Sequence, residues 1–199
     1  MAQDEAGGRR LVVTGAAGVL GRAVADLARA RGWQVAGIDF ASAPDGGIIG
    51  GVDLADAAAA AEAMAQAATR LGGGIDVLAC VAGGFAWEPL GPDSPATFDR
   101  LWRLNLLTAA NACAAALAHL AAPGGAIVLV GAASALKAGG GVAAYAGAKA
   151  AVHRLAEALA EEQKPRGIRV NAVLPSIIDT PANRADMPEA DFARWVRPE

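Results

Sequence analysis

The feature that most constrains the fold of this chain is a regular alternation of short runs rich in β-branched residues with longer alanine-rich stretches. Strands separated by helices in this order are typical of a parallel sheet that carries helices on both faces. We expect strands at residues 10–14, 34–39, 48–52, 76–81, 126–130 and 168–173. We expect helices at residues 19–30, 56–71, 96–121 and 143–163, each of which is followed by Gly or Pro. The alternation therefore predicts an α/β protein of three layers.

The chain has 199 residues, of which 54% are hydrophobic, which suffices for one buried core. We therefore expect residues 1–199 to form a single domain. Residues 1–8 are polar and lack the basic and apolar regions of a secretory signal, so they are predicted to be a flexible tail. After Pro175 the chain becomes rich in proline and charge, which predicts a substrate loop or short helical lid over residues 176–199.

Charge and cysteine content narrow the class of partner. The net charge of −3 offers no broad cationic surface, so we expect no binding of nucleic acid or of anionic lipid. The uncharged stretch between Arg103 and Lys137 is broken by Pro123 and by polar residues, which favours a buried helix over a membrane span. Cys80 and Cys113 belong to no Cys/His cluster, which predicts reduced thiols in a cytoplasmic protein and no metal site. The expected partner is a small molecule.

The first predicted strand runs directly into a glycine-rich turn, TGAAGVLG at residues 14–21, which opens the first helix. Gly15 permits a tight turn, Gly18 lets backbone amides approach a pyrophosphate, and Gly21 lets the helix pack close to the strand. The helix N-terminus adds partial positive charge. This unit predicts a Rossmann-type doubly wound sheet that binds a dinucleotide. The residues of the turn expected to contact it are Gly15, Ala17, Gly18, Val19, Leu20 and Gly21.

Asp39 closes the second predicted strand, where the adenosine ribose of a bound dinucleotide is expected. Its carboxylate can accept both ribose hydroxyls and would repel a 2′-phosphate, and the neighbouring Phe40 brings no cation to offset that charge. NADH is therefore the expected cofactor, and NADPH is disfavoured. Arg22, directly after the last glycine, is a nearby cation that could still reach a phosphate.

Tyr145 and Lys149 form a candidate catalytic pair, because a spacing of four places both side chains on one face of the predicted helix 143–163. An ammonium beside a phenol is expected to lower the pKa of the phenol toward the working pH. Tyr145 would then exchange a proton while a nicotinamide exchanges a hydride, and Lys149 could also hold the nicotinamide ribose. The alternative is a surface tyrosine beside a solvated lysine. Tyr145 is the only tyrosine of the chain and begins the helix after the fifth strand, at the edge where such sheets bind ligands.

In their order along nearly the whole chain, these segments resemble the short-chain dehydrogenase/reductase family. Besides the glycine turn and the Tyr145/Lys149 pair, the matches are Asp53-Leu54, Ala82-Gly83, Asn105 and the segment from Pro175 to Thr180. The resemblance implies that Asp53 contacts the adenine and that Asn105 supports a proton relay through water. It implies that Ile178 and Thr180 hold the nicotinamide carboxamide. Together with the turn, the implied cofactor-binding set is Asp39, Phe40, Asp53, Leu54, Ala82, Gly83, Gly84, Tyr145, Lys149, Pro175, Ile178 and Thr180.

One position departs from the family pattern. The family's catalytic serine lies thirteen residues before the tyrosine, and Ala132 stands there in this chain. The loss of a donor that polarises a substrate carbonyl costs a few kcal/mol of transition-state stabilisation. Ser134 is a candidate substitute, although a residue two places further on is expected to point elsewhere.

A narrower resemblance accounts for this departure. The segments at residues 80–84, 131–132, 145–149 and 173–192 are similar to the quinonoid dihydropteridine reductase branch, which also lacks the serine. A quinonoid pterin spreads incoming charge through its conjugated ring, so its reduction depends less on a polarising hydroxyl. Asn105 follows the broader family instead, which keeps another reductase in consideration.

Three functions remain open on the sequence. The first is NADH-dependent reduction of a quinonoid dihydropterin, and the second is oxidation or reduction of another alcohol or carbonyl compound. The third is NAD(H) binding without catalysis, because the chain ends at Glu199, before the last helix and strand usual in the family. A homodimer is expected through the alanine-rich helices 96–121 and 143–163. Phe85 and Trp87 are expected either to stack on a flat heterocycle or to cover the core.

Overall fold

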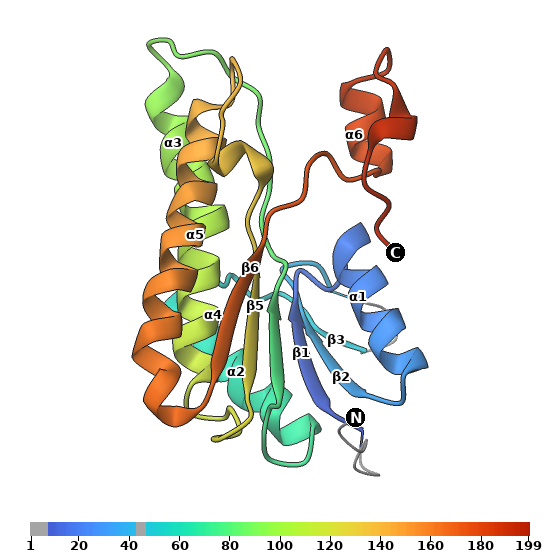
Figure 1. The fold of residues 1–199 in the computed structure, drawn as a ribbon, viewed down its shortest axis with the longest axis vertical. Coiled ribbons are helices and arrows are strands. Elements are labelled where there is room, and N and C mark those ends of the chain that lie inside the picture. Colours follow the sequence, from blue (N-terminus) through green and yellow to red (C-terminus); the bar gives the residue numbers. More distant parts are fainter. Residues whose placement is uncertain (1–7, 43–46) are drawn as a thin grey trace.

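The computed structural model describes residues 8–42 and 47–199, so most of the predicted tail lies outside the described residues. The described chain builds one parallel sheet of six strands in the order β3-β2-β1-β4-β5-β6 (Figure 1). The strand order reverses between β1 and β4, and ligands of such sheets bind beyond the carboxyl ends of the strands at that point. The strands are β1 (Arg10–Thr14), β2 (Gln34–Ile38), β3 (Ile48–Ile49), β4 (Val77–Cys80), β5 (Ala126–Val130) and β6 (Arg169–Val173).

Helices cover both faces of the sheet, so the prediction of a doubly wound α/β fold in three layers is confirmed (Figure 1). Helix α1 covers one face, and α2, α4 and α5 cover the other. The seventh strand that the family resemblance would add is absent from residues 8–42 and 47–199. The helices are α1 (Val19–Ala30), α2 (Ala57–Arg70), α3 (Ser94–Leu101), α4 (Thr108–Ala116), α5 (Ala143–Gln163) and α6 (Pro181–Asp186).

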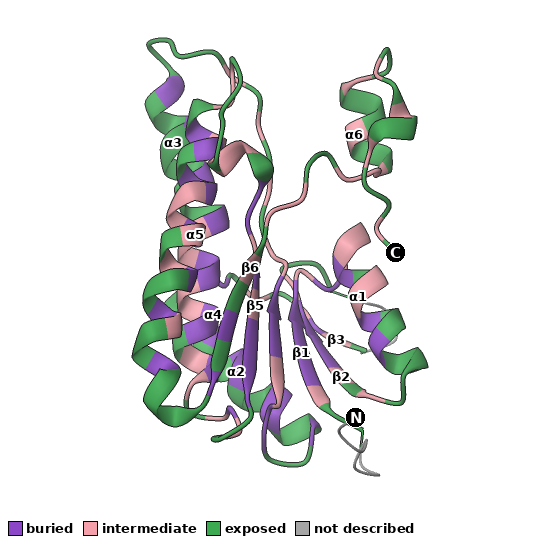
Figure 2. Ribbon diagram, in the orientation of Figure 1, coloured by how far each residue is buried: buried purple, intermediate pink, exposed green. Residues whose placement is uncertain are grey.

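The core has two parts, one on each face of the sheet, because successive strand residues point to opposite faces. In β1, Leu11 and Val13 pack with Ala25 of α1, whereas Val12 packs in the larger cluster under α2, α4 and α5. Figure 2 shows buried residues concentrated in the central strands and on the inner sides of the helices, while α6 is partly or fully exposed. Both faces of the sheet are therefore packed against helices below the carboxyl edge.

The predicted helix at 96–121 differs from the structure in its bounds and in its middle. Helix α3 begins at Ser94, a π-helical turn at Trp102–Leu107 follows, and α4 ends at Ala116. The helix ends early because residues 117–121 turn back to the sheet, where the backbone of Ile75 bonds His119 and Ala121. The predicted strand at 48–52 is also shorter, since only Ile48–Ile49 pairs with β2.

After β6 the chain continues through an extended segment, residues 174–180, which we call the neck. It leads into α6 and the C-terminal residues, so that residues 176–199 form a small substructure above the carboxyl edge (Figure 1). The side chain of Thr180 caps α6 by accepting a hydrogen bond from the amide of Asn183 at 3.1 Å. Ile178 and Val196 form a β-bridge that closes the segment on itself. Short helical turns also lie at Ala133–Ala135, Lys164–Arg166 and Phe192–Arg194.

None of the helices in the described part of the chain is both long and apolar enough to cross a membrane.

Candidate active site

A cleft of about 1220 Å³ opens at the carboxyl edge of the sheet, across the point where the strand order reverses. Its wall combines the glycine turn after β1, the loops after β2, β4 and β5, the start of α5 and the neck before α6. Every residue that we predicted to bind the cofactor lines this cleft, from Gly15 to Thr180. Asn105 does not line it. Segments far apart in the sequence thus meet because parallel strands end at one edge.

The three glycines of the turn are needed for different structural reasons. Gly15 has a φ of +67°, and a Cβ there would lie 2.7 Å from the amide nitrogen of Ala82. A Cβ on Gly21 would overlap the carbonyl oxygen of Gly15. A Cβ on Gly18 would meet only the Gly15 carbonyl oxygen, at 3.2 Å, and Gly18 lines the cleft. The fold itself therefore requires Gly15 and Gly21, whereas Gly18 keeps space open for a ligand.

The N-terminus of α1 faces the cleft without a capping side chain. Gly18 is its N-cap, makes no side-chain hydrogen bond, and the first turn holds no acidic residue. The first amides of an α-helix lack partners within the helix and carry partial positive charge. An open approach at Gly18 and these free amides fit the pyrophosphate of a dinucleotide.

Asp39 follows β2, lines the cleft and is held by two backbone amides. Its carboxylate accepts hydrogen bonds from Ala17 and from Ala41, each at 2.9 Å. Asp39 therefore braces the glycine turn and also fixes a negative charge where the sequence predicts the adenosine ribose. Asp53 lies on the same wall and forms an ion pair with Arg103 at 3.5 Å.

Tyr145 and Lys149 lie one helical turn apart on α5, and both side chains line the cleft. Lys149 is 5% exposed, and its Nζ donates a hydrogen bond of 2.9 Å to the carbonyl oxygen of Val130. The same Nζ lies 5.9 Å from the centroid of the Tyr145 ring. The predicted pair is therefore adjacent, with the amine anchored to the end of β5.

Burial governs the ionisation of both groups. It lowers the pKa of Lys149 from 10.5 to about 8 and raises the pKa of Tyr145 above 10.0. The prediction that the lysine lowers the pKa of the phenol is thus wrong for this structure. The reason is that desolvation penalises the charged form of each group, while the amine is directed at Val130 rather than at the phenol.

Asn105 lies on the π-helical turn, 1% exposed, directly behind the wall of the cleft. Its side chain accepts from the amide of Gly84 at 3.2 Å and donates to the carbonyl oxygens of Gly84 and Leu101, each at 3.0 Å. A Cβ on Gly83 would lie 2.6 Å from Asn105 Oδ1 and 3.2 Å from Lys149 Nζ. The side chain of Asn105 therefore holds the loop after β4 against the lysine, and its side-chain nitrogen donates twice inside the protein.

Aromatic side chains line the part of the cleft next to Tyr145. The rings of Phe85 and Tyr145 meet edge to face, with centroids 5.0 Å apart. Trp87 donates from Nε1 to the carbonyl oxygen of Gly140 at 3.2 Å. Phe85 and Trp87 remain 43% and 64% exposed, so they face the cleft rather than cover the core. Ala132, at the family's serine position, is buried in the same wall.

A family model described as short chain dehydrogenase matches residues 9–191. The chain belongs to the short-chain dehydrogenase family. It is therefore an oxidoreductase by family, and the resemblance seen in the sequence is confirmed.

Curated relatives and solved structures agree with this assignment. A dihydropteridine reductase from Dictyostelium discoideum is 29% identical over 194 residues, which cover 94% of this chain and 82% of the relative. A 2-(R)-hydroxypropyl-CoM dehydrogenase from Xanthobacter autotrophicus is 32% identical over 200 residues, which cover 91% of this chain and 80% of the relative. A short-chain dehydrogenase from Burkholderia cenocepacia, solved in complex with NADP, has a TM-score of 0.83 at 27% identity and covers 96% of this chain and 86% of its own.

Some residues that line the cleft of this short-chain dehydrogenase were not singled out from the sequence. They lie on the π-helical turn, at the start of α4, in the loop after β5 and at α6, and the sequence pattern alone did not place them at the sheet edge. They include Leu104, Thr108, Lys137, Asn183 and Met187.

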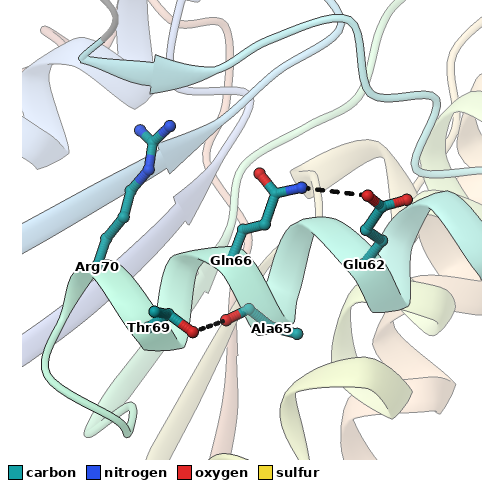
Figure 3. Close-up of a pocket in the computed structure, with 5 residues that line it drawn as sticks. All are labelled: Glu62, Ala65, Gln66, Thr69 and Arg70. Atoms are coloured by element: carbon teal, nitrogen blue, oxygen red, sulfur yellow. Dashed lines mark hydrogen bonds between the residues drawn. The ribbon is translucent and has the colours of Figure 1, made fainter.

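A second hollow, of about 420 Å³, lies on the outer face of α2 (Figure 3). Two side-chain hydrogen bonds there are local to the helix: Gln66 donates to Glu62 at 3.3 Å, and Thr69 donates to the carbonyl oxygen of Ala65 at 2.9 Å. These contacts are ordinary for a solvated helix surface, and none of the predicted site residues lies there. The cleft at the sheet edge is therefore the candidate active site.

The glycine turn of this short-chain dehydrogenase supports a matched pair of substitutions. Gly18→Ala should weaken binding of the nicotinamide cofactor by about tenfold or more, because the new methyl group enters the space left open for phosphates, with little change in stability. Gly21→Ala should lower the melting temperature by roughly 5 to 10 °C, because its Cβ overlaps the Gly15 carbonyl oxygen. Fluorescence titration and thermal denaturation measure the two effects. Normal cofactor affinity in Gly18→Ala would contradict the assignment of this turn.

Proposed function

We propose that this protein is an NADH-dependent reductase that converts a quinonoid dihydropterin to the tetrahydropterin, with Tyr145 as the proton donor. The observation that carries the proposal is a cleft in which the Tyr145/Lys149 pair is complete while Ala132 replaces the polarising hydroxyl. A carbonyl substrate would lose stabilisation at that point, whereas a conjugated pterin ring can spread the incoming charge over several atoms. The dihydropteridine reductase of Dictyostelium discoideum, similar over 94% of this chain, supports the same substrate class.

The residues around the cleft suit a nicotinamide dinucleotide. The similar structure from Burkholderia cenocepacia holds NADP. In this chain the N-terminus of α1 would hold the phosphates, and Asp39 would accept hydrogen bonds from the adenosine ribose. Lys149 would donate to the nicotinamide ribose, and Ile178 and Thr180 would hold the carboxamide. Bound NADH would supply the hydride.

The proton comes from the protein in this proposal. Burial raises the pKa of Tyr145, so the phenol holds its proton at neutral pH and can donate it. Lys149, with a pKa of about 8, is mostly an ammonium at pH 7 and stabilises the phenolate left behind. Asn105 holds the loop at Gly84 in place and thereby positions Lys149. The exposed faces of Phe85 and Trp87 offer a surface on which a flat heterocycle can stack.

A substrate panel tests the proposal. Freshly generated quinonoid dihydropterin and a set of simple ketones and alcohols are compared in a stopped-flow assay, each with the matching reduced or oxidised cofactor. We expect rapid NADH oxidation with the pterin and little turnover of the simple ketones. Turnover of ketones or alcohols without any pterin reduction would overturn the proposed substrate.

The cofactor preference is tested by Asp39→Asn. The substitution removes the negative charge but keeps an oxygen that can accept from one backbone amide. Because the charge would repel a 2′-phosphate, its loss should shift the ratio of NADH to NADPH affinity toward NADPH by about ten- to a hundredfold. Titration of both cofactors against the parent and the variant measures the shift. An unchanged ratio would show that Asp39 does not set the preference.

A second candidate is a reductase or dehydrogenase for another alcohol or carbonyl compound. It is favoured by the relative from Xanthobacter autotrophicus, which is named a dehydrogenase and is 32% identical over 91% of this chain. Asn105, which follows the broader family, fits this candidate as well. Tight NADH binding without turnover of any substrate in the panel would instead favour a protein that binds the dinucleotide without catalysis.

We also propose a homodimer formed through the α3–α4 segment and α5. Phe98 and Trp102, four residues apart, are 40% and 46% exposed on that segment. Sedimentation at micromolar concentration tests this, and a monomer would contradict it.

A cytoplasmic location stays a proposal that rests on the sequence, in which Cys80 and Cys113 belong to no Cys/His cluster.

A further inference from the structure

Ser134 carries an unusual hydroxyl. It lies in the helical turn Ala133–Ala135 between β5 and α5, and its Oγ is shielded from solvent without any hydrogen-bond partner. Over residues 8–42 and 47–199, it is the one buried side-chain oxygen or nitrogen in this condition. A buried hydroxyl without a partner is costly, because it gives up its bonds to water and receives none in return. Such a group in a folded protein calls for an explanation.

The backbone around Ser134 is held by hydrogen bonds, whereas the side-chain hydroxyl makes none. The amide of Ala133 donates to the carbonyl oxygen of Pro175 at 2.8 Å, which ties the turn to the neck of the α6 segment. The amide of Ala135 donates to the carbonyl oxygen of Ala132 at 3.0 Å. The hydroxyl can therefore rotate about the Cα–Cβ bond without breaking any hydrogen bond of the protein.

Ser134 lines the same cleft as Tyr145 and Lys149. Ala132 has an extended backbone, with φ −160° and ψ 151°, and the helical turn begins only after it. Because the backbone changes from extended to helical between them, the side chains of residues 132 and 134 leave the chain in different directions. Ser134 is therefore placed to reach a part of the ligand other than the atom that Ala132 adjoins.

We propose that Ser134 is a substrate-binding residue, whose hydroxyl donates a hydrogen bond to a ring nitrogen or carbonyl oxygen of the substrate away from the reacting atoms. This inference rests on the proposed function in one respect: a substrate that carries such an acceptor must be reduced next to Tyr145. The contact exists before and during hydride transfer, so it contributes to binding and not to the chemical step. It also gives the unpaired hydroxyl a partner when the substrate is bound.

The test is Ser134→Ala, measured on whichever substrate of the panel is turned over. We expect KM to rise by about ten- to thirtyfold with kcat within about twofold of the parent, since a binding contact alone is lost. A value of kcat/KM within twofold of the parent would overturn the proposal. This outcome is separate from the choice of substrate, because the proposed pterin can fail while Ser134→Ala still raises KM for a ketone.

Stability gives a readout that does not depend on turnover. Ser134→Ala removes an unpaired buried hydroxyl, so the melting temperature should rise. The matched control is Ser94→Ala, because the Ser94 hydroxyl is also buried but accepts from the amide of Gly91 at 2.8 Å and donates to the carbonyl oxygen of Pro89 at 3.3 Å. The control should lower the melting temperature. A lower melting temperature in Ser134→Ala would show that the hydroxyl has a structural partner and would overturn the proposal.

Discussion

Tyr145→Phe should lower kcat by about 10²- to 10⁴-fold while NADH still binds, because the substitution removes the proposed proton donor and leaves the ring. The edge-to-face contact with Phe85, with centroids 5.0 Å apart, is kept by the phenylalanine ring. The anchored amine of Lys149 is likewise unaffected, since its Nζ bonds the Val130 carbonyl oxygen and not the phenol. The loss should therefore appear in the chemical step alone.

Single-turnover measurement with preformed enzyme and NADH separates that step from binding. The NADH dissociation constant and the melting temperature serve as controls, and both should stay close to those of the parent. If Tyr145→Phe reduced its substrate at the parental rate, the proton would have to come from solvent or another group. The role proposed for Tyr145 would then be wrong.

Lys149→Met should abolish most of the activity and, at the same time, make the protein more stable at pH 7. The activity loss, about 10²-fold or more in kcat/KM, follows from losing the charge proposed to stabilise the phenolate and the proposed donor to the nicotinamide ribose. The gain in stability follows from removing a buried amine that is 5% exposed. Methionine has a similar length and needs no hydration.

The pH dependence of this gain has a definite sign. Lys149 has a folded pKa of about 8, below its ordinary 10.5, so the unfolded chain binds more protons than the folded chain between those two values. The parent therefore becomes more stable as pH rises through this window, and below pH 8 the buried ammonium costs about 3 kcal/mol. Lys149→Met removes that cost but leaves the Val130 carbonyl oxygen without its donor, so the net gain is smaller.

Denaturant unfolding of the parent and of Lys149→Met at several pH values measures the difference. We expect Lys149→Met to be the more stable protein at pH 7, and the difference to shrink between pH 8 and 10.5. The activity of the parent should depend on the protonation of the same Lys149 amine. Its kcat/KM for reduction should therefore fall as pH rises past about 8. A variant that is less stable than the parent at pH 7 would show that the amine is not penalised by burial.

The cofactor half of the site was predictable because each of its residues follows a strand. The glycine turn follows β1, Asp39 follows β2, and Gly83 follows β4, so the strand pattern alone places them at one edge. The role expected for Asn105 came from the family resemblance instead, and the structure places this residue on the π-helical turn at Trp102–Leu107, behind the wall of the cleft. A periodic pattern of apolar residues does not reveal such an insertion.

The local order of residues determined that this chain forms a doubly wound sheet with a glycine-rich turn after the first strand. It also determined that Tyr145 and Lys149 share one face of a helix. Hydrophobic periodicity and turn preferences act over a few residues, so the sequence contains both. The tertiary structure alone decided the pKa directions of that pair and the unpaired hydroxyl of Ser134. Desolvation and hydrogen-bond partners depend on which distant segments pack around a group, and no local pattern contains that information.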